Sequence, residues 1–151
     1  MQGKDFKFLE KLLSEMDEEK VIAQLSIIQD PFTLHVFAAN YNWDNGFNIP
    51  FAILENKHCD LGTGLLLFYE GDGYILLVNE KEVLTSENKE WKIFLHTLYK
   101  KLMNLDFHSQ QIAFDSGLTK VQKFKLQKEN PSIEEVFINI SQGVEVDTRV
   151  L

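Results

Sequence analysis

Three aspartates are the residues of this chain best placed for chemistry. Asp44, Asp60 and Asp72 each lie near a predicted boundary between helices or strands. Along one rim of a stacked array, such carboxylates could hold a divalent cation or act as general acid and base. The competing interpretation is capping and turn formation, because an aspartate side chain accepts hydrogen bonds from nearby backbone amides. We favour capping, and keep a small hydrolase or metal-dependent enzyme using these carboxylates as the alternative.

The histidines and the single cysteine form no metal-binding or catalytic motif. No two histidines are three or four residues apart, and the chain has neither HExxH nor paired cysteines. His58, Cys59 and Asp60 are adjacent potential ligands, but adjacent side chains on a turn rarely converge on one metal. Cys59 could form a dyad with a histidine, although a small buried residue is the commoner role of a lone cysteine. We therefore predict no metal, no cofactor and no catalytic residues.

Two further segments resemble binding motifs only in part. Gly62 and Gly64, in DLGTG, resemble a phosphate-binding loop, but no lysine follows at the required spacing and Asp60 would repel a phosphate. Close helix packing is the preferred role of these glycines. The basic segment LTKVQKFKLQK could contact RNA, but the acidic chain favours a solvated helix face or a contact with the acidic half.

The charge distribution favours a basic protein partner. The net charge of −8 argues against DNA binding, which requires cations. Residues 1–80 hold 5 lysines and 13 acids, whereas residues 81–128 hold 9 lysines and 5 acids. Arg149 is the only arginine, which argues against an enzyme that binds phosphate groups through guanidinium side chains. The acidic N-terminal half suits a basic partner.

Helical periodicity and start motifs place most of these residues on helices. Asp17, Asp30 and Asp60 are predicted N-caps, and Pro31 suits a first helical position. The predicted helices are 4–16, one starting after Asp17, 32–40, 50–56, one starting after Asp60, one from about 86 to 102, and a last one opened by a Ser132/Glu135 capping box and ending near 139. Residues 74–78 and 112–114 are predicted strands that could pair, and residues 118–130 fit either a helix or a strand.

A weak internal repeat relates two of the predicted helix pairs. With a shift of 30 residues, Asp30 aligns with Asp60 and Thr33 with Thr63. Each unit would be a helical hairpin that buries its apolar face on its neighbour, as in solenoid proteins. We therefore predict a mainly α (α+β) fold. It has stacked helical hairpins in residues 4–70, a small two-stranded β element and C-terminal helices.

Length and hydropathy predict one cytoplasmic domain. Residues 1–143 are expected to form a single helix-dominated domain, with residues 144–151 as a flexible tail. No apolar run approaches the roughly 18 residues that span a bilayer, and the N-terminal residues lack the apolar core of a signal peptide. We expect no membrane association.

The segment NYNWDNGFNIP connects the two predicted hairpins. Asn45 and Gly46 tolerate positive φ, which suits a turn, but a turn does not require Trp43. Its indole either fills the seam between the hairpins, which we favour, or anchors a partner. The candidate binding residues are Asn42, Trp43, Asp44, Asn45, Phe47 and Asp60.

The same segment carries a family resemblance. NWDNGF, followed by IPFAILENKHCDLGTGLLLFY, resembles a bacterial family of domains of unknown function with an Asn-Trp-Asp-(Asp/Asn)-Gly-Phe motif and a later Cys-Asp-Leu-Gly-Thr segment. The resemblance covers residues 40–73 and extends more loosely to residue 130. Asn45 and Gly64 stand where aspartate and alanine are typical. The resemblance implies a small, mainly helical, cytosolic bacterial domain with no established activity, some of whose relatives accompany toxin–immunity gene clusters.

The leading functional hypothesis is a non-catalytic interaction protein that binds or neutralises a basic protein, in the manner of an immunity protein. The first alternative is the carboxylate enzyme described above. The second is a self-associating scaffold that uses the aromatic surface of Trp43 and Phe47.

Overall fold

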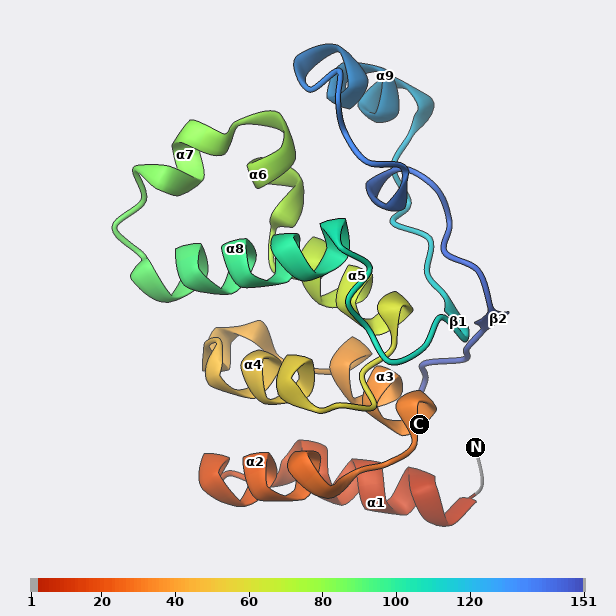
Figure 1. Ribbon diagram of the computed structural model, residues 1–151. Helices are drawn as coiled ribbons and strands as arrows, with labels where there is room; N and C mark the ends of the chain where they lie inside the picture. The colour runs from red at the N-terminus through yellow and green to blue at the C-terminus, as the bar shows by residue number, and fades with distance from the viewer. Residues whose placement is uncertain (1–2, 151) are drawn as a thin grey trace.

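The protein is mainly helical, which confirms the predicted fold class. The computed structural model describes residues 3–150 (Figure 1). Its elements are α1 (Gly3–Ser14), α2 (Glu18–Ile27), α3 (Pro31–Ala39), η1 (Trp43–Asn45), α4 (Asn48–Glu55), α5 (Leu61–Glu70), α6 (Gly73–Val78), α7 (Glu80–Leu84), α8 (Lys89–Met103), β1 (Ile112–Ala113), α9 (Lys120–Glu129), η2 (Glu135–Phe137) and β2 (Val144–Glu145). No helix within residues 3–150 is long and apolar enough to cross a membrane.

The predicted aspartate caps form. The Asp17 carboxylate accepts from Glu19 N at 3.1 Å, Asp30 from Phe32 N at 3.1 Å, and Asp60 from Gly62 N at 2.9 Å. Each bond satisfies an amide that the first helical turn leaves without a partner. Pro31 occupies the first turn of α3, where its missing N–H costs nothing.

Two helical hairpins, α2–α3 and α4–α5, lie one above the other in the lower part of Figure 1. Corresponding helices pack together, α2 on α4 and α3 on α5. Asn56, at the end of α4, joins the layers because its amide donates to the carbonyl oxygens of Leu25 and Ile28 at 2.8 and 2.9 Å. Segments 30 residues apart therefore lie on one another, as the weak repeat predicted.

Helix α8 covers the upper side of this stack. Its buried stripe consists of Phe94, Leu95, Leu98 and Leu102, each 0% exposed, and the helix packs on α5. Their spacing is that of one face of a helix, as the sequence indicated.

Residues 74–78 form helix α6, so the predicted strand there is wrong. Asp72 takes a left-handed φ of 65°, which ends α5 and starts a new helix. Gly73, Leu76 and Leu77 are then buried at helical spacing, and Gly73 lies directly on the ring of Phe68. The alternation of a strand would have buried only every second residue. Burial of a helical face therefore overrides the β-propensity of YILLV.

The second predicted strand exists, but with another partner. Strand β1 pairs in parallel with β2, with Ile112 opposite Val144 and Ala113 opposite Glu145. Strand β2 lies within residues 144–151, which were predicted as a flexible tail. The same segment is bonded to the helical stack, because Asn40 Nδ2 donates to Thr148 O at 2.7 Å. Leu151 lies outside the described residues, and the mobility of the segment stays a prediction.

Two further predictions concern the C-terminal third: the conformation of residues 118–130 and the capping box at Ser132 and Glu135. Residues 120–129 are the helix α9, opened by a capping box between Thr119 and Gln122. The capping box predicted for Ser132 and Glu135 is wrong, because only the short turn η2 forms, without a side-chain cap. Phe137 is buried there against Phe68 and Tyr99, which packs this segment onto the core.

Candidate functional site

The connection between the hairpins is a short capped turn. Asn42 Oδ1 accepts from Asp44 N at 3.0 Å, and Tyr41 OH donates to Gly46 O at 2.6 Å. Gly46 has φ of 94°, a conformation that favours glycine. Asn42, Asp44 and Asn45 are exposed. Three of the predicted binding residues therefore project from a well-defined turn.

Trp43 fills a seam, but between this turn and α8. Its half-buried ring makes edge-to-face contacts with Tyr41, Phe47 and Phe94, at centroid distances of 5.5, 6.0 and 5.9 Å. It also lies beside Gly71 at the end of α5. The indole Nε1 is buried and has no hydrogen-bond partner among the described residues. The ring packs the turn onto the core, and Phe47 is used in the same cluster.

Helix N-termini and turns on the side of the stack that carries the Trp43 turn hold 8 of the chain's 23 acidic residues. The α1–α2 turn, the α3–α4 connection and the α7–α8 loop all lie on the left in Figure 1, and Asn48 Nδ2 links the start of α4 to Glu18 of α2 at 2.9 Å. Trp91 Nε1, at the start of α8, donates to Gly71 O at 2.9 Å, so the end of α5 belongs to the same surface. We call this surface the acidic edge; its carboxylates are Glu15, Asp17, Glu18, Glu19, Asp44, Asp72, Glu87 and Glu90, and its lysines are Lys20, Lys89 and Lys92.

None of these eight carboxylates forms a salt bridge within residues 3–150. Several of them stabilise their own helix N-termini, where negative charge is favourable. Their number nevertheless leaves a net negative surface that a cationic partner could neutralise.

Asp60 has a different role, because it is 0% exposed. One carboxylate oxygen accepts from Ser109 Oγ and Gln111 N, both at 2.6 Å. The other accepts from Gly62 N at 2.9 Å and Ile112 N at 3.1 Å. Asp60 therefore ties the hairpin stack to the chain that leads into β1. Sequence reasoning found its cap but missed these partners, which lie 49 to 52 residues away and carry no local pattern.

The three candidate aspartates do not come together. Asp60 precedes α5 and Asp72 follows it, so about 15 Å of helix separates them. Asp44 and Asp72 belong to the acidic edge, whereas Asp60 is buried at the other end of α5. Within residues 3–150, no group of three His, Cys, Asp or Glu side chains could hold a metal ion. The carboxylate set of the enzyme alternative is thus not assembled.

The neighbours of Asp60 are packed rather than reactive. Cys59 is 3% exposed, and burial, with a smaller contribution from Asp60, raises its thiol pKa to about 12. A thiol with so high a pKa holds almost no thiolate at neutral pH. His58 lies edge-to-face against His108, with ring centroids 5.4 Å apart. This turn contains no nucleophile–base pair.

Gly62 and Gly64 serve close packing. A Cβ at Gly62 would clash with the backbone oxygen of Ile112, and one at Gly64 would clash with the ring of Phe107. The preferred interpretation of DLGTG is confirmed, although the glycines pack against a strand and a loop rather than a helix.

A buried polar pair lies one turn further along α5. His35 Nδ1 is 2.9 Å from Thr63 Oγ1, with the two residues 3% and 0% exposed. Burial lowers the pKa of His35 to about 4, against a smaller opposing effect of Asp60, so the imidazole is neutral at pH 7. Sequence reasoning placed His35 on a helix but had no pattern that could link it to Thr63.

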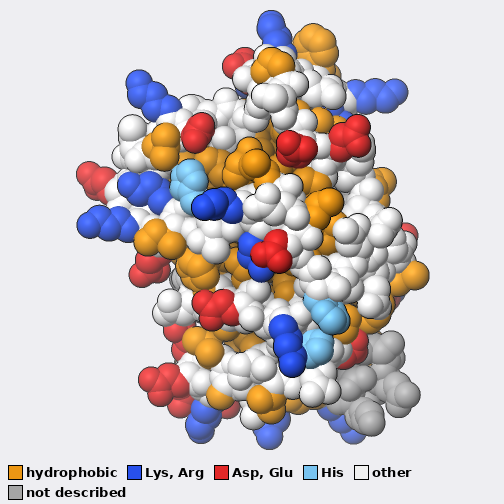
Figure 2. Space-filling view, in the orientation of Figure 1, with side chains coloured by type: hydrophobic (Ala, Val, Ile, Leu, Met, Phe, Trp, Pro, Cys, Tyr) orange, Lys and Arg blue, Asp and Glu red, His pale blue; other side chains and the backbone are white. Residues whose placement is uncertain are grey.

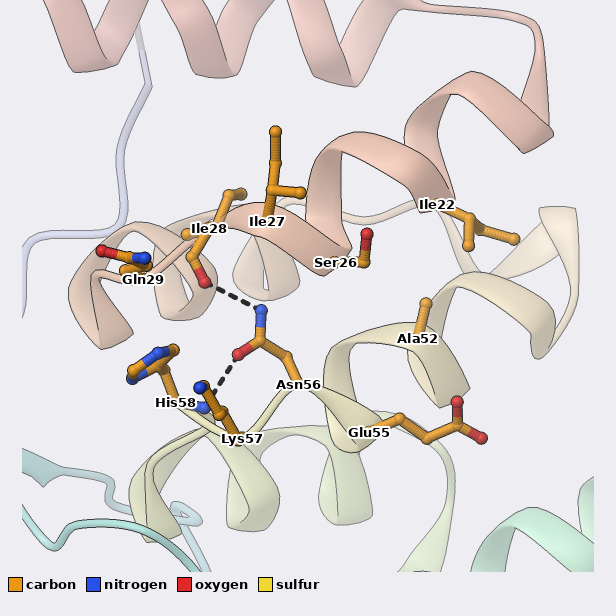
Figure 3. A pocket seen from close by; sticks show the side chains of 10 residues that line it. All are labelled: Ile22, Ser26, Ile27, Ile28, Gln29, Ala52, Glu55, Asn56, Lys57 and His58. Carbon is orange, nitrogen blue, oxygen red and sulfur yellow. Dashed lines mark hydrogen bonds between the residues drawn. The ribbon is translucent and has the colours of Figure 1, made fainter.

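A surface groove with a volume of about 540 Å³ lies between α2 and α4. Figure 3 shows Asn56 reaching across it, donating to Ile28 O and accepting from the backbone N–H of His58. The charged lining residues are Glu55 and Lys57, of opposite sign. Because the amide of Asn56 is already bonded to the protein's own backbone, this groove presents no buried polar group to a ligand.

Comparison with known proteins adds one finding. A domain described as a domain of unknown function (DUF4274) is found at residues 29–103, from the turn before α3 to the end of α8. This range contains the Trp43 turn, Asp60 and the His35–Thr63 pair. No curated protein and no solved structure matches the chain.

Proposed function

We propose that this protein is a non-catalytic interaction module whose acidic edge binds a basic segment of a protein partner. The observation that carries the proposal is the set of eight carboxylates on one edge, none of them in a salt bridge within residues 3–150. Such a surface attracts a cationic partner over about 10 Å at moderate ionic strength.

The rigidity of the edge supports this role. Trp43, Phe47 and Phe94 pack the α3–α4 connection onto α8, so Asp44 is held at a fixed place relative to the α8 N-terminus. A preorganised surface loses little conformational entropy on binding. The exposed amides of Asn42 and Asn45 can add hydrogen bonds beside the charges.

Two variants with the same net charge test the proposal. The edge variant carries Glu19→Gln, Asp44→Asn, Glu87→Gln and Glu90→Gln. The control carries Glu10→Gln, Glu55→Gln, Glu129→Gln and Glu134→Gln, also at exposed carboxylates but outside the edge. Binding of a fluorescent octalysine peptide is measured by anisotropy at low and moderate salt. We expect affinity to fall about tenfold or more for the edge variant and about threefold or less for the control. Equal losses would show that only net charge matters and would contradict the assignment.

The finer proposal is an immunity-like role, in which the partner is a basic toxin. Its test is co-expression with a toxic product of a neighbouring gene in the native host. We expect growth to be rescued by the wild type and the control variant but not by the edge variant. Rescue by all three would contradict a role for the edge.

Self-association is a second candidate, favoured by helix α9. Val121 and Phe124 are 76% and 68% exposed, and only Leu126 of this helix is buried. At the α9 end of the molecule, the top in Figure 2, hydrophobic and basic side chains are exposed together. The four lysines of α9 are complementary in charge to the acidic edge, so we propose the edge of a second copy as the occupant.

Sedimentation velocity at low and high salt tests this candidate. We expect a concentration-dependent dimer or larger species at low salt that is lost in Phe124→Ser and in the edge variant. A wild type that stays monomeric at all concentrations would refute it and leave the heterologous partner as the proposal.

A further inference from the structure

A second concave surface lies between helices α3 and α5 and the C-terminal part of the chain. It has a volume of about 440 Å³. One wall is formed by α3 and α5, and the other by residues 113–115 and 145–148, around the β1–β2 pair. This volume falls within the range of small-molecule sites, about 300–1,000 Å³. We call it the β-side cleft.

His35 lines this cleft with one ring nitrogen unused. Its Nδ1 is bonded to Thr63 Oγ1, and its Nε2 makes no hydrogen bond with a described residue. Thr63 is 0% exposed, and its hydroxyl likewise has no other partner among the described residues. If Nδ1 carried the proton, the hydroxyl hydrogen of Thr63 would be buried without an acceptor. The hydrogen-bond network therefore assigns the proton to Nε2, which offers one neutral N–H donor to the cleft.

The charged groups of the cleft are all acidic. Glu70, Asp115 and Glu145 line it, and no lysine or arginine does. Partial burial of its carboxylate raises the pKa of Glu70. A neutral His35 adds no positive charge. The remaining walls include Leu66, Phe114 and Val146, which suit an apolar group.

We propose that the β-side cleft binds a small organic cation that carries a hydrogen-bond-acceptor oxygen, such as an amino-acid amide. The ammonium group pairs with Glu70, the carbonyl oxygen accepts from His35 Nε2–H, and the side chain packs on Leu66 and Phe114, while Asp115 and Glu145 add negative charge to the rim. This site is independent of the acidic edge, because the two surfaces share no residue.

Three probes of similar size separate these requirements. L-leucinamide has the cation and the oxygen, 3-methylbutan-1-amine has the cation only, and N-acetyl-L-leucine carries a negative charge. We expect millimolar binding of leucinamide in an NMR titration, with shifts at residues 113–115 and 145–148. Binding of the plain amine should be about tenfold weaker, and N-acetyl-leucine should not bind.

The matched variants are Glu70→Gln in the cleft and Glu55→Gln in the α2–α4 groove, both exposed carboxylates. Glu70→Gln should weaken leucinamide binding about tenfold, whereas Glu55→Gln should leave it unchanged. The ¹⁵N shifts of His35 report the tautomer without any variant, and we expect protonation at Nε2. Equal binding of leucinamide and N-acetyl-leucine, equal effects of the two variants, or protonation at Nδ1 would overturn the proposal.

Discussion

Replacement of Asp60 by alanine is expected to destabilise the fold far more than the same change at Asp30. The two residues are equivalent in the 30-residue repeat, and both cap a helix. Asp30 is exposed, and within residues 3–150 its carboxylate accepts hydrogen bonds from Phe32 N and Thr33 Oγ1 of its own turn and from no other residue. Asp60 is 0% exposed and adds three donors from the Ser109–Ile112 segment.

The expected magnitudes differ accordingly. Loss of an aspartate cap costs about 1 kcal/mol, the value we expect for Asp30→Ala. Loss of a buried carboxylate leaves four donors without their acceptor, and bonds to charged groups contribute about 1.5–3 kcal/mol each before non-additivity. We expect Asp60→Ala to lower the free energy of unfolding by roughly 3–5 kcal/mol. Since domains of this size lose about 2–4 °C per kcal/mol, Tm should fall by roughly 10 °C, against about 3 °C for Asp30→Ala.

Urea unfolding of both variants, followed by circular dichroism, provides the measurement. The double variant Asp60→Ala/Ser109→Ala should show a coupling free energy of about 1 kcal/mol or more, because the two side chains are bonded directly. If Asp60→Ala costs no more than Asp30→Ala, the tie between the hairpin stack and the C-terminal segment does not stabilise the protein. The account of Asp60 as a structural residue would then be wrong.

Three other predictions follow from the interior. Because burial holds the folded-state pKa of His35 near 4, below its ordinary 6.5, the unfolded chain binds more protons between these values, and the free energy of unfolding should fall by up to about 3 kcal/mol as pH is lowered from 6.5 to 4. The charged groups around this imidazole are Asp60, Glu70, Asp115 and Glu145. The fall in the free energy of unfolding, measured by urea unfolding at each pH, should be largely lost in His35→Leu. An unchanged pH dependence in that variant would assign the fall to other groups. Gly62→Ala should cost several kcal/mol in chemical denaturation and Gly64→Ala less, since the new methyl meets the backbone of Ile112 in the first case and a side-chain ring in the second; the reverse order would contradict the packing described. Cys59 should react with a thiol reagent only after unfolding, as followed by absorbance with and without urea, and rapid reaction of the native protein would refute its burial.

Local patterns in the sequence determined α1 to α5 and α8, although not α6 and α7. Asp17, Asp30 and Asp60 were recognisable as caps, because a cap bond joins residues two positions apart. The stripe of Phe94, Leu95, Leu98 and Leu102 predicted the buried face of α8 by its spacing. The 30-residue repeat even predicted which helices would stack, since equivalent units bury equivalent faces. In the candidate site, the sequence marked Trp43 and its exposed neighbours.

Only the tertiary structure decided which of these residues share a site. It buried Asp60 beneath Ser109 and Ile112, joined His35 to Thr63, and placed Trp43 against Phe94 of α8. It also made residues 74–78 helical and gave β1 a partner near the C-terminus. Helix periods and caps are set by neighbours within about four residues, so a sequence displays them directly. Contacts between segments 28 to 52 residues apart depend on how whole faces pack, and no local pattern encodes that choice.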